Sequence, residues 1–257
     1  MPRILGLDAF ANALSAHAAS YVLIGGAACS VLFDEVGQDF RLTKDLDVVV
    51  LADQPEPGFA RDLWSFIIEG GYEAGARREG GCVYYRFQLP VGSPNRSALP
   101  AQIELFSRHP DFKLVDEDSA VAPLPFDDAV SSLSAIILDD GYYEFIKDGA
   151  VMIGGVSTLD ALHIIPLKMR AHVDLNRKYA AGVPDGTNDK NLRKHRADVT
   201  RLAGLLADAD RLPLKEAMLA DAKAFFEDYE AYIMRQTNRK QTSALVEALD
   251  FLRRVYL

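Results

Sequence analysis

The sequence has 257 residues, of which 49% are hydrophobic and 25% are charged, and its formal net charge is −9. This composition is typical of a globular protein, and together with the lack of an internal repeat it excludes a disordered chain and a solenoid. An acidic protein repels phosphates, so the sequence also excludes a surface that attracts nucleic acid everywhere.

Helices and strands alternate in the first part of the chain. Apolar residues at helical spacing predict a helix over 7–18, and the apolar run YVLI predicts a strand that ends on Gly25 and Gly26. The next elements expected are a helix over 27–36, a strand over 46–51 and a helix over 59–69. This order is typical of an α/β arrangement.

Two hairpins are expected after these elements. Residues 82–90 and 101–106 alternate apolar and polar positions and are joined by a turn-rich loop, so we expect them to pair as antiparallel strands. The segment YYEFIKDGAVMIGG is expected to form a second hairpin with its turn at Asp148 and Gly149. The sheet should therefore be mixed rather than purely parallel.

From Thr158 onward the pattern becomes helical. We expect a helix that is kinked or restarted at Pro166 and ends near Lys178, and three further helices up to the C-terminus. The fold class is therefore predicted to be α+β. We expect an α/β domain over residues 1–125 and a domain with a hairpin and helices over residues 126–257.

Asp45 and Asp47 stand at the start of the strand LDVVVL. Side chains two apart on a strand point to the same face, and two like charges there repel unless a positive charge lies between them. Each feature has a common alternative explanation, because a glycine pair is usually a turn and an acidic pair is often a solvated strand end. Glu104, between Ile103 and Leu105, either points to solvent or shares the face of the aspartates.

Taken together, the segments YVLIGGAA, TKDLDVVV and QIELF resemble the nucleotidyltransferase fold of the DNA polymerase β superfamily. Within it the chain looks most like the AbiE-type (AbiEii) toxin group, to which ALHIIPLKMRA and RKHRADVTRL are also similar. The resemblance spans residues 20 to 205. Eighteen residues lie between Gly26 and Asp45, more than in the superfamily pattern, so the loop VGQDFR has to be accommodated.

The resemblance implies roles for particular residues. Two Mg²⁺ ions, with Mn²⁺ as an alternative, would be held by Asp45, Asp47 and Glu104. Glu104 would either ligate the second metal ion or act as general base on the attacking hydroxyl. The residues expected to bind the nucleotide are Gly25, Gly26, Lys44, Lys168 and Arg170. Asp198 would orient a basic neighbour or the nucleotide. For Lys168 a solvated helix lysine is an equally good interpretation.

The expected function is transfer of an NMP from an NTP to an acceptor hydroxyl. The acceptor would be an RNA such as tRNA or a protein, and the resemblance admits a cognate antitoxin as partner. Residues 168–201 hold nine Lys or Arg against four Asp, which favours a phosphate-rich partner. A nucleotidyltransferase with a small-molecule acceptor, as in antibiotic modification, and an inactive nucleotide- or protein-binding module are the alternatives.

Other candidate chemistries have little support. His195 is interpreted as part of a basic face and His163 as a satisfied helix residue, and no histidines have the spacing of zinc ligands. Cys29 and Cys82 are too few for a disulfide framework. No apolar run reaches the ~18 residues that cross a bilayer. Asp8 also interrupts a signal-like N-terminus, so we expect a cytoplasmic protein without a membrane partner.

Overall fold

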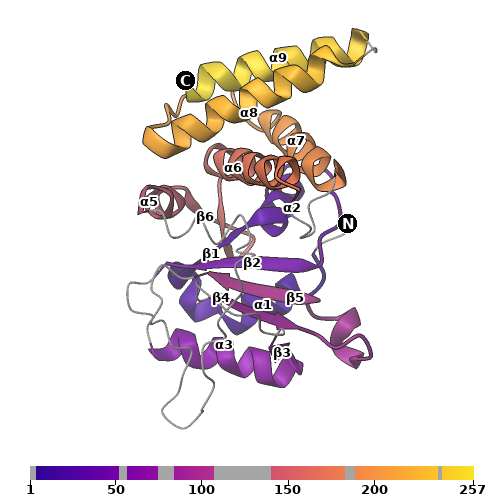
Figure 1. Ribbon diagram of the computed structural model, residues 1–257. Coiled ribbons are helices and arrows are strands. Elements are labelled where there is room, and N and C mark those ends of the chain that lie inside the picture. Colours follow the sequence, from indigo (N-terminus) through magenta and orange to yellow (C-terminus); the bar gives the residue numbers. More distant parts are fainter. Residues whose placement is uncertain (1–3, 52–56, 75–83, 107–139, 183–188, 237–238) are drawn as a thin grey trace. The chain divides into compact units, whose positions relative to one another are not determined.

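The computed structural model describes residues 4–51, 57–74, 84–106, 140–182, 189–236 and 239–257 (Figure 1). The chain divides into two compact units, Met1–Asp160 (unit 1) and Ala161–Leu257 (unit 2). This division differs from the boundary expected between residues 125 and 126. The reason is that the 150–159 hairpin belongs to the sheet of unit 1, where one of its strands pairs in parallel with the strand Tyr21–Ile24.

Unit 1 is built on one mixed sheet, as the sequence predicts for an α+β protein. Its strands are β1 (Tyr21–Ile24), β2 (Asp45–Val50), β3 (Glu73–Ala74), β4 (Tyr84–Gln88), β5 (Gln102–Phe106), β6 (Ala150–Ile153) and β7 (Val156–Leu159). The order across the sheet is β3-β4-β5-β2-β1-β7-β6. β2 pairs in parallel with β5 and antiparallel with β1, and the expected β4–β5 hairpin is antiparallel.

Helices cover both faces of this sheet. The helical elements of unit 1 are α1 (Leu7–Ala13), a 3-10 segment (Ser15–Ser20), α2 (Gly25–Glu35), α3 (Pro57–Gly70), a 3-10 turn (Pro94–Ser97) and α5 (Asp140–Asp148). α1 and α3 lie on one side of the sheet and α2 lies on the other (Figure 1). On the side of α1 and α3, aromatic contacts connect the helices to the sheet: Phe10 of α1 contacts Tyr21 of β1, and Trp64 of α3 contacts Phe87 of β4. On the other side, α2 buries Leu32 and Phe33, so the apolar core of unit 1 extends over both faces of the sheet.

Two local expectations for unit 1 are wrong. The opening helix ends at Ala13 instead of residue 18, because Leu14 leaves helical geometry and a 3-10 segment follows. Residues 140–148 form α5 rather than a strand. Their buried residues Tyr142, Tyr143 and Ile146 follow helical spacing, which outweighs the strand propensity of the aromatic residues.

The turn of the second hairpin is also displaced from its expected position. It is formed by Gly154 and Gly155, not by Asp148 and Gly149. Both turn glycines have positive φ, 58° and 85°. Tight two-residue hairpins require such angles, and glycine adopts them without steric cost, so the glycine pair forms a better turn than Asp148 and Gly149.

Unit 2 is helical throughout its described residues. It consists of α6 (Ala161–Ala180), α7 (Asp189–Ala203), α8 (Glu216–Met234) and α9 (Arg239–Tyr256). α6 continues through Pro166 without the restart expected there. Proline has no N–H to donate to the carbonyl of Leu162, and the hydroxyl of Tyr256 donates to that carbonyl instead, at 2.8 Å. Within the ranges given above, no helix is long and apolar enough to cross a membrane.

Candidate functional site

Three carboxylates share one face of the sheet in unit 1. Asp45 and Asp47 are two apart on β2, and the parallel register places Asp47 opposite Glu104 of β5. Residues paired in this way point to the same face, so the alternative left open for Glu104 is resolved in favour of the face of the aspartates. Asp45 is exposed and Asp47 is half-buried, whereas Glu104 is only 6% exposed.

The glycine pair lies directly against this face. Gly25 has φ +67°, and a Cβ placed on it would lie 1.9 Å from Oδ2 of Asp47. Only glycine lets the first turn of α2 begin this close to the carboxylate, and no side chain caps that end of the helix. The first backbone N–H groups of α2 therefore start beside Asp47, at the positive end of the helix dipole.

A loop between the end of α2 at Glu35 and the start of β2 at Asp45 accounts for the long spacing between the glycines and the aspartates. After α2 the chain turns at Gly37, and Phe40 stacks on Phe33 with ring centroids 5.1 Å apart. The loop then returns to the start of α2, where a Cβ on Gly26 would lie 3.1 Å from Oγ1 of Thr43 and 3.3 Å from Nη2 of Arg41. The extra residues thus bring a guanidinium and a hydroxyl to the glycine pair.

Glu104 is held by its neighbours on the same face. Nε of Arg86 donates to Oε1 of Glu104 at 2.7 Å, and Nε2 of Gln102 donates to the same oxygen at 2.9 Å. Burial raises the pKa of the Glu104 carboxyl; the Arg86 guanidinium lowers it in part, and the charge of Asp45 raises it again. The Glu104 carboxyl therefore interacts with the charge of Asp45 while it accepts a hydrogen bond from Arg86.

The donor set can be compared with what a divalent cation requires. Asp45 and Asp47 fit Mg²⁺ or Mn²⁺, which take oxygen ligands and keep open positions for water and phosphate. Among the residues that the structure describes, no three Asp, Glu, His or Cys side chains are grouped as metal ligands. Glu104 shares this face, but its Oε1 is engaged by Arg86 and Gln102.

Unit 2 holds the other predicted residues. Nζ of Lys168 lies 3.2 Å from Oδ2 of Asp198, and both side chains are buried. Asp198 thus has a basic neighbour, and a role for this pair in a site remains a prediction. Burial, followed by the charges of Lys168 and Lys194, holds the pKa of His195 well below its usual value. An imidazole that stays neutral beside Lys168 does not add to a basic face, in contrast to the sequence-based interpretation of His195.

Arg170 and Lys44 have simpler surroundings. Nη1 of Arg170 lies 2.7 Å from Asp221 of α8, and its Nε lies 3.3 Å from Asp174 of α6. Arg170 therefore joins two helices, and a contact with a nucleotide remains a prediction. The side chain of Lys44 is exposed, and its carbonyl accepts a hydrogen bond from the N–H of Ala101 at 2.8 Å.

Each unit contains some of the predicted site residues. Unit 1 brings together Gly25, Gly26, Asp45, Asp47 and Glu104, and unit 2 brings Lys168 to Asp198. Sequence reasoning missed Arg86 and Arg41. Arg86 occupies a polar position in the alternating strand YYRFQ, but its partner follows only from the β4–β5 register. Arg41 gives no periodic signal, because it lies in a loop.

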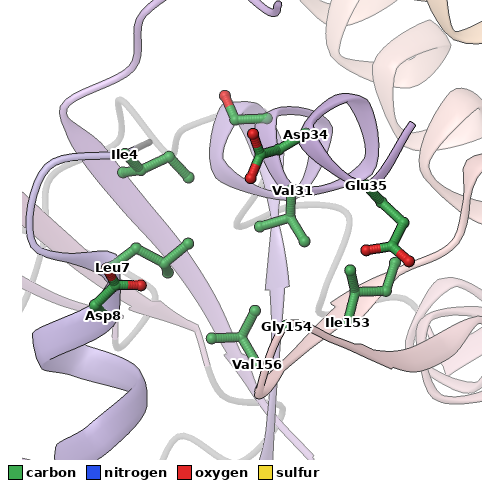
Figure 2. A pocket seen from close by; sticks show the side chains of 10 residues that line it. Ile4, Leu7, Asp8, Val31, Asp34, Glu35, Ile153, Gly154 and Val156 are labelled. Carbon is green, nitrogen blue, oxygen red and sulfur yellow. The ribbon is translucent and has the colours of Figure 1, made fainter. Parts of the chain in front are cut away.

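A separate hollow lies at the other end of α2. A pocket of about 120 Å³ is lined by Ile4, Leu7, Asp8, Ser30, Val31, Asp34, Glu35, Ile153, Gly154 and Val156 (Figure 2). Its apolar residues come from the N-terminal segment, from α2 and from the β6–β7 hairpin. None of the predicted site residues lines it, so the pocket is distinct from the carboxylate face.

Comparisons with known proteins add no assignment. No family model matches the chain, and neither a curated protein nor a solved structure matches it significantly.

Proposed function

We propose that the chain is a Mg²⁺-dependent nucleotidyltransferase that moves an NMP from an NTP to an acceptor hydroxyl. The observation that carries this proposal is the position of Asp47, which lies against Gly25 at the start of α2 and opposite Glu104 across the β2–β5 register. The uncapped N-terminus of α2, which is suited to bind phosphate, therefore lies beside a carboxylate of this set. The order of strand, glycine pair, helix and Asp-x-Asp strand also supports the nucleotidyltransferase-like fold that the sequence resemblance implies.

The residues of this face divide into two roles. The N–H groups of α2 and the guanidinium of Arg41 are suited to bind phosphate oxygens, because both supply positive charge beside Gly26. Asp45 and Asp47 would hold the divalent cation, which when bound stabilises charge on the entering and leaving oxygens. Glu104 would complete the ligand set or accept the proton of the acceptor hydroxyl.

The reaction is a displacement at the α-phosphorus. The acceptor oxygen forms a bond to the α-phosphorus, and the bond to the bridging oxygen breaks, which releases pyrophosphate. The hydroxyl proton leaves to Glu104 or to water. The side chains of unit 1 orient the phosphates and neutralise or accept charge, which is the main catalytic contribution in phosphoryl chemistry of this kind.

Unit 2 suggests what the acceptor is. Arg193, Lys194 and Arg201 are exposed on α7, within the segment where basic residues outnumber acidic ones. A basic surface on an otherwise acidic protein favours an RNA acceptor such as tRNA. A protein acceptor, a small-molecule acceptor and a cognate antitoxin partner remain alternatives within this proposal.

Calorimetric titration tests the site. Each of the four NTPs is titrated with Mg²⁺ into the wild type, into the Asp45→Ala, Asp47→Ala variant and into Glu69→Ala, which removes an exposed acid of α3 on the other side of the sheet. We expect Mg²⁺-dependent binding of at least one NTP to the wild type and to Glu69→Ala, and none to the double variant. Equal binding to all three proteins would contradict the proposal.

An inactive nucleotide-binding module is the second candidate. It is favoured by one observation, the ion pair of Glu104 with Arg86, which keeps the third carboxylate engaged. The two candidates differ in turnover. Pyrophosphate release that depends on Mg²⁺ and is lost in Asp47→Ala indicates an enzyme, whereas NTP binding without pyrophosphate release in the presence of RNA, protein and small-molecule acceptors indicates a binding module.

A further inference from the structure

A row of side chains crosses three strands on the polar face of the sheet. The β4–β5 register places Arg86 opposite Glu104, and the β5–β2 register places Glu104 opposite Asp47. Adjacent strands are about 4.8 Å apart, so the backbone of Arg86 lies two strand spacings, about 10 Å, from that of Asp47. Glu104 stands between a guanidinium on one side and the aspartate pair on the other.

The two neighbours of Glu104 make opposite demands on its carboxylate. Oε1 of Glu104 accepts hydrogen bonds from both Arg86 and Gln102, and Nε2 of Gln88 in turn donates to Gln102 at 2.6 Å. This chain of hydrogen bonds holds the carboxylate toward β4. A cation bound by Asp45 and Asp47 attracts the same carboxylate in the opposite direction, because it carries the largest charge at the site.

A nucleotide can change this balance. The side chain of Arg86 is 32% exposed, whereas that of Glu104 is 8% exposed, so the guanidinium is the member of the pair that solvent and ligands can reach. Arginine binds phosphate oxygens through two parallel hydrogen bonds, at least as well as it binds a carboxylate. Triphosphate oxygens therefore compete with Glu104 for Arg86.

We propose that Arg86 is a positioning residue that holds Glu104 away from the aspartate pair until nucleotide phosphates take up its guanidinium. Glu104 then turns toward Asp45 and Asp47 and becomes the third carboxylate of the site. This inference rests on the proposed function. It accounts for a set of three carboxylates that share a face and yet are not grouped as metal ligands in the part of the chain that the structure describes.

The test measures binding of the metal alone and of the nucleotide separately. Mn²⁺ is titrated calorimetrically into the wild type, Arg86→Met and Arg61→Met; Arg61 is an exposed arginine of α3, on the opposite side of the sheet. With Glu104 released, Arg86→Met should bind Mn²⁺ about tenfold more tightly than the wild type and bind ATP with Mn²⁺ about tenfold more weakly, as expected for loss of a charged hydrogen bond. Arg61→Met should match the wild type in both titrations.

Two further variants identify the route of the effect. In Arg86→Met, Glu104→Gln the gain in Mn²⁺ affinity should disappear, because the released carboxylate is gone. Arg86→Lys should restore both affinities in part, since it keeps the charge but not the two parallel hydrogen bonds. If Arg86→Met does not fold, as judged by circular dichroism, Arg86→Gln replaces it, with a smaller gain for Mn²⁺ and a similar loss for ATP.

The outcomes separate this inference from the proposed function. If the wild type binds ATP with Mn²⁺ and folded Arg86→Met binds Mn²⁺ no more tightly than the wild type, the Arg86–Glu104 pair is a fixed structural ion pair and the inference is overturned. If the wild type binds no NTP with either metal, the proposed function itself is wrong. A gain in Mn²⁺ affinity that persists without Glu104 also contradicts the role given to Arg86.

Discussion

The two units use charged side chains in different ways. In unit 1, Asp45, Asp47 and Glu104 stand together on one face, and burial raises the pKa of Glu104. In unit 2, nitrogen-bearing side chains of α6 meet acids of α7 and α8: Lys168 meets Asp198, Arg170 meets Asp221, and His172 meets Asp228. Gathered like charges are costly to fold and are typical of binding sites, whereas matched charges join helices.

The same difference appears in the whole sequence of each unit. Residues 1–160 contain 11 Lys or Arg against 24 Asp or Glu, and residues 161–257 contain 17 against 13. A nucleotide is repelled by the charge of unit 1 unless cations offset it locally. The acidic character of unit 1 therefore predicts that the nucleotide binding proposed above depends on a metal ion.

The largest expected effect comes from breaking a matched pair. Lys168→Met leaves the buried carboxylate of Asp198 without its ammonium partner, which should lower the free energy of unfolding by about 3–5 kcal/mol. Urea denaturation measures this loss, with Lys223→Met, an exposed lysine of α8, as the control. A loss below about 1 kcal/mol would show that the pair does not join α6 to α7, because surface pairs contribute no more than this.

A substitution at the glycine pair should affect both stability and binding. In Gly25→Ala the new methyl group collides with Oδ2 of Asp47 and φ stays at +67°, so we expect a loss of about 2 kcal/mol in stability. Mg²⁺-dependent NTP binding should fall about tenfold, because the Asp47 carboxylate is displaced. Gly37→Ala also has a positive φ but nothing near its Cβ, so its backbone strain should leave binding unchanged.

Asp228 of unit 2 and Glu104 of unit 1 should contribute to the pH dependence of stability with opposite signs. Hydrogen bonding from His172 holds the pKa of Asp228 below its usual 3.8, so this group stabilises the fold above that pH, and the stabilisation is lost as pH falls toward the lower pKa. Burial raises the pKa of Glu104 above its usual 4.5, because the charged carboxylate is disfavoured in the folded protein. Ionisation of Glu104 therefore makes the fold less stable as pH rises above 4.5.

Urea denaturation across about pH 3 to 7 separates these contributions. Asp228→Asn should flatten the loss of stability in acid, and Glu104→Gln should remove the decline on the alkaline side of the usual glutamate pKa. A decline of the same size in Glu104→Gln as in the wild type would mean that another group causes it.

The smallest expected effect is on the helix that contains proline. Tyr256→Phe removes the donor to the carbonyl of Leu162, which Pro166 cannot satisfy, and should cost about 1 kcal/mol. Thermal denaturation measures this change. Tyr179→Phe, an exposed position near the end of the same helix, should have no measurable effect.

Elements that depend on neighbouring residues in the chain could be predicted from the sequence, whereas those that depend on distant contacts could not. Period-two patterns and glycine signals were sufficient for β1, β2, the β4–β5 hairpin and the orientation of Asp45 and Asp47, because these depend on neighbours in the chain. The same reasoning failed at α5, where aromatic residues favoured a strand and burial against the rest of unit 1 favoured a helix.

The candidate site shows the same limit. The partner of Glu104 depends on the register between β4 and β5, which no single segment determines. The proximity of Arg41 to Gly26 depends on the stacking of Phe40 on Phe33 in a loop without periodic signal. Sequence reasoning thus identified the acids of the site but not the arginines that lie beside Glu104 and Gly26.

The proposal of nucleotidyl transfer is tested most directly by label transfer. The wild type and Asp47→Ala are incubated with Mg²⁺, RNA and protein acceptors, and an NTP labelled at either the α- or the γ-phosphate. We predict that the wild type transfers the α label and not the γ label to one acceptor, and that Asp47→Ala transfers neither. Transfer of the γ label, or α-label transfer that is equal in Asp47→Ala, would contradict the account.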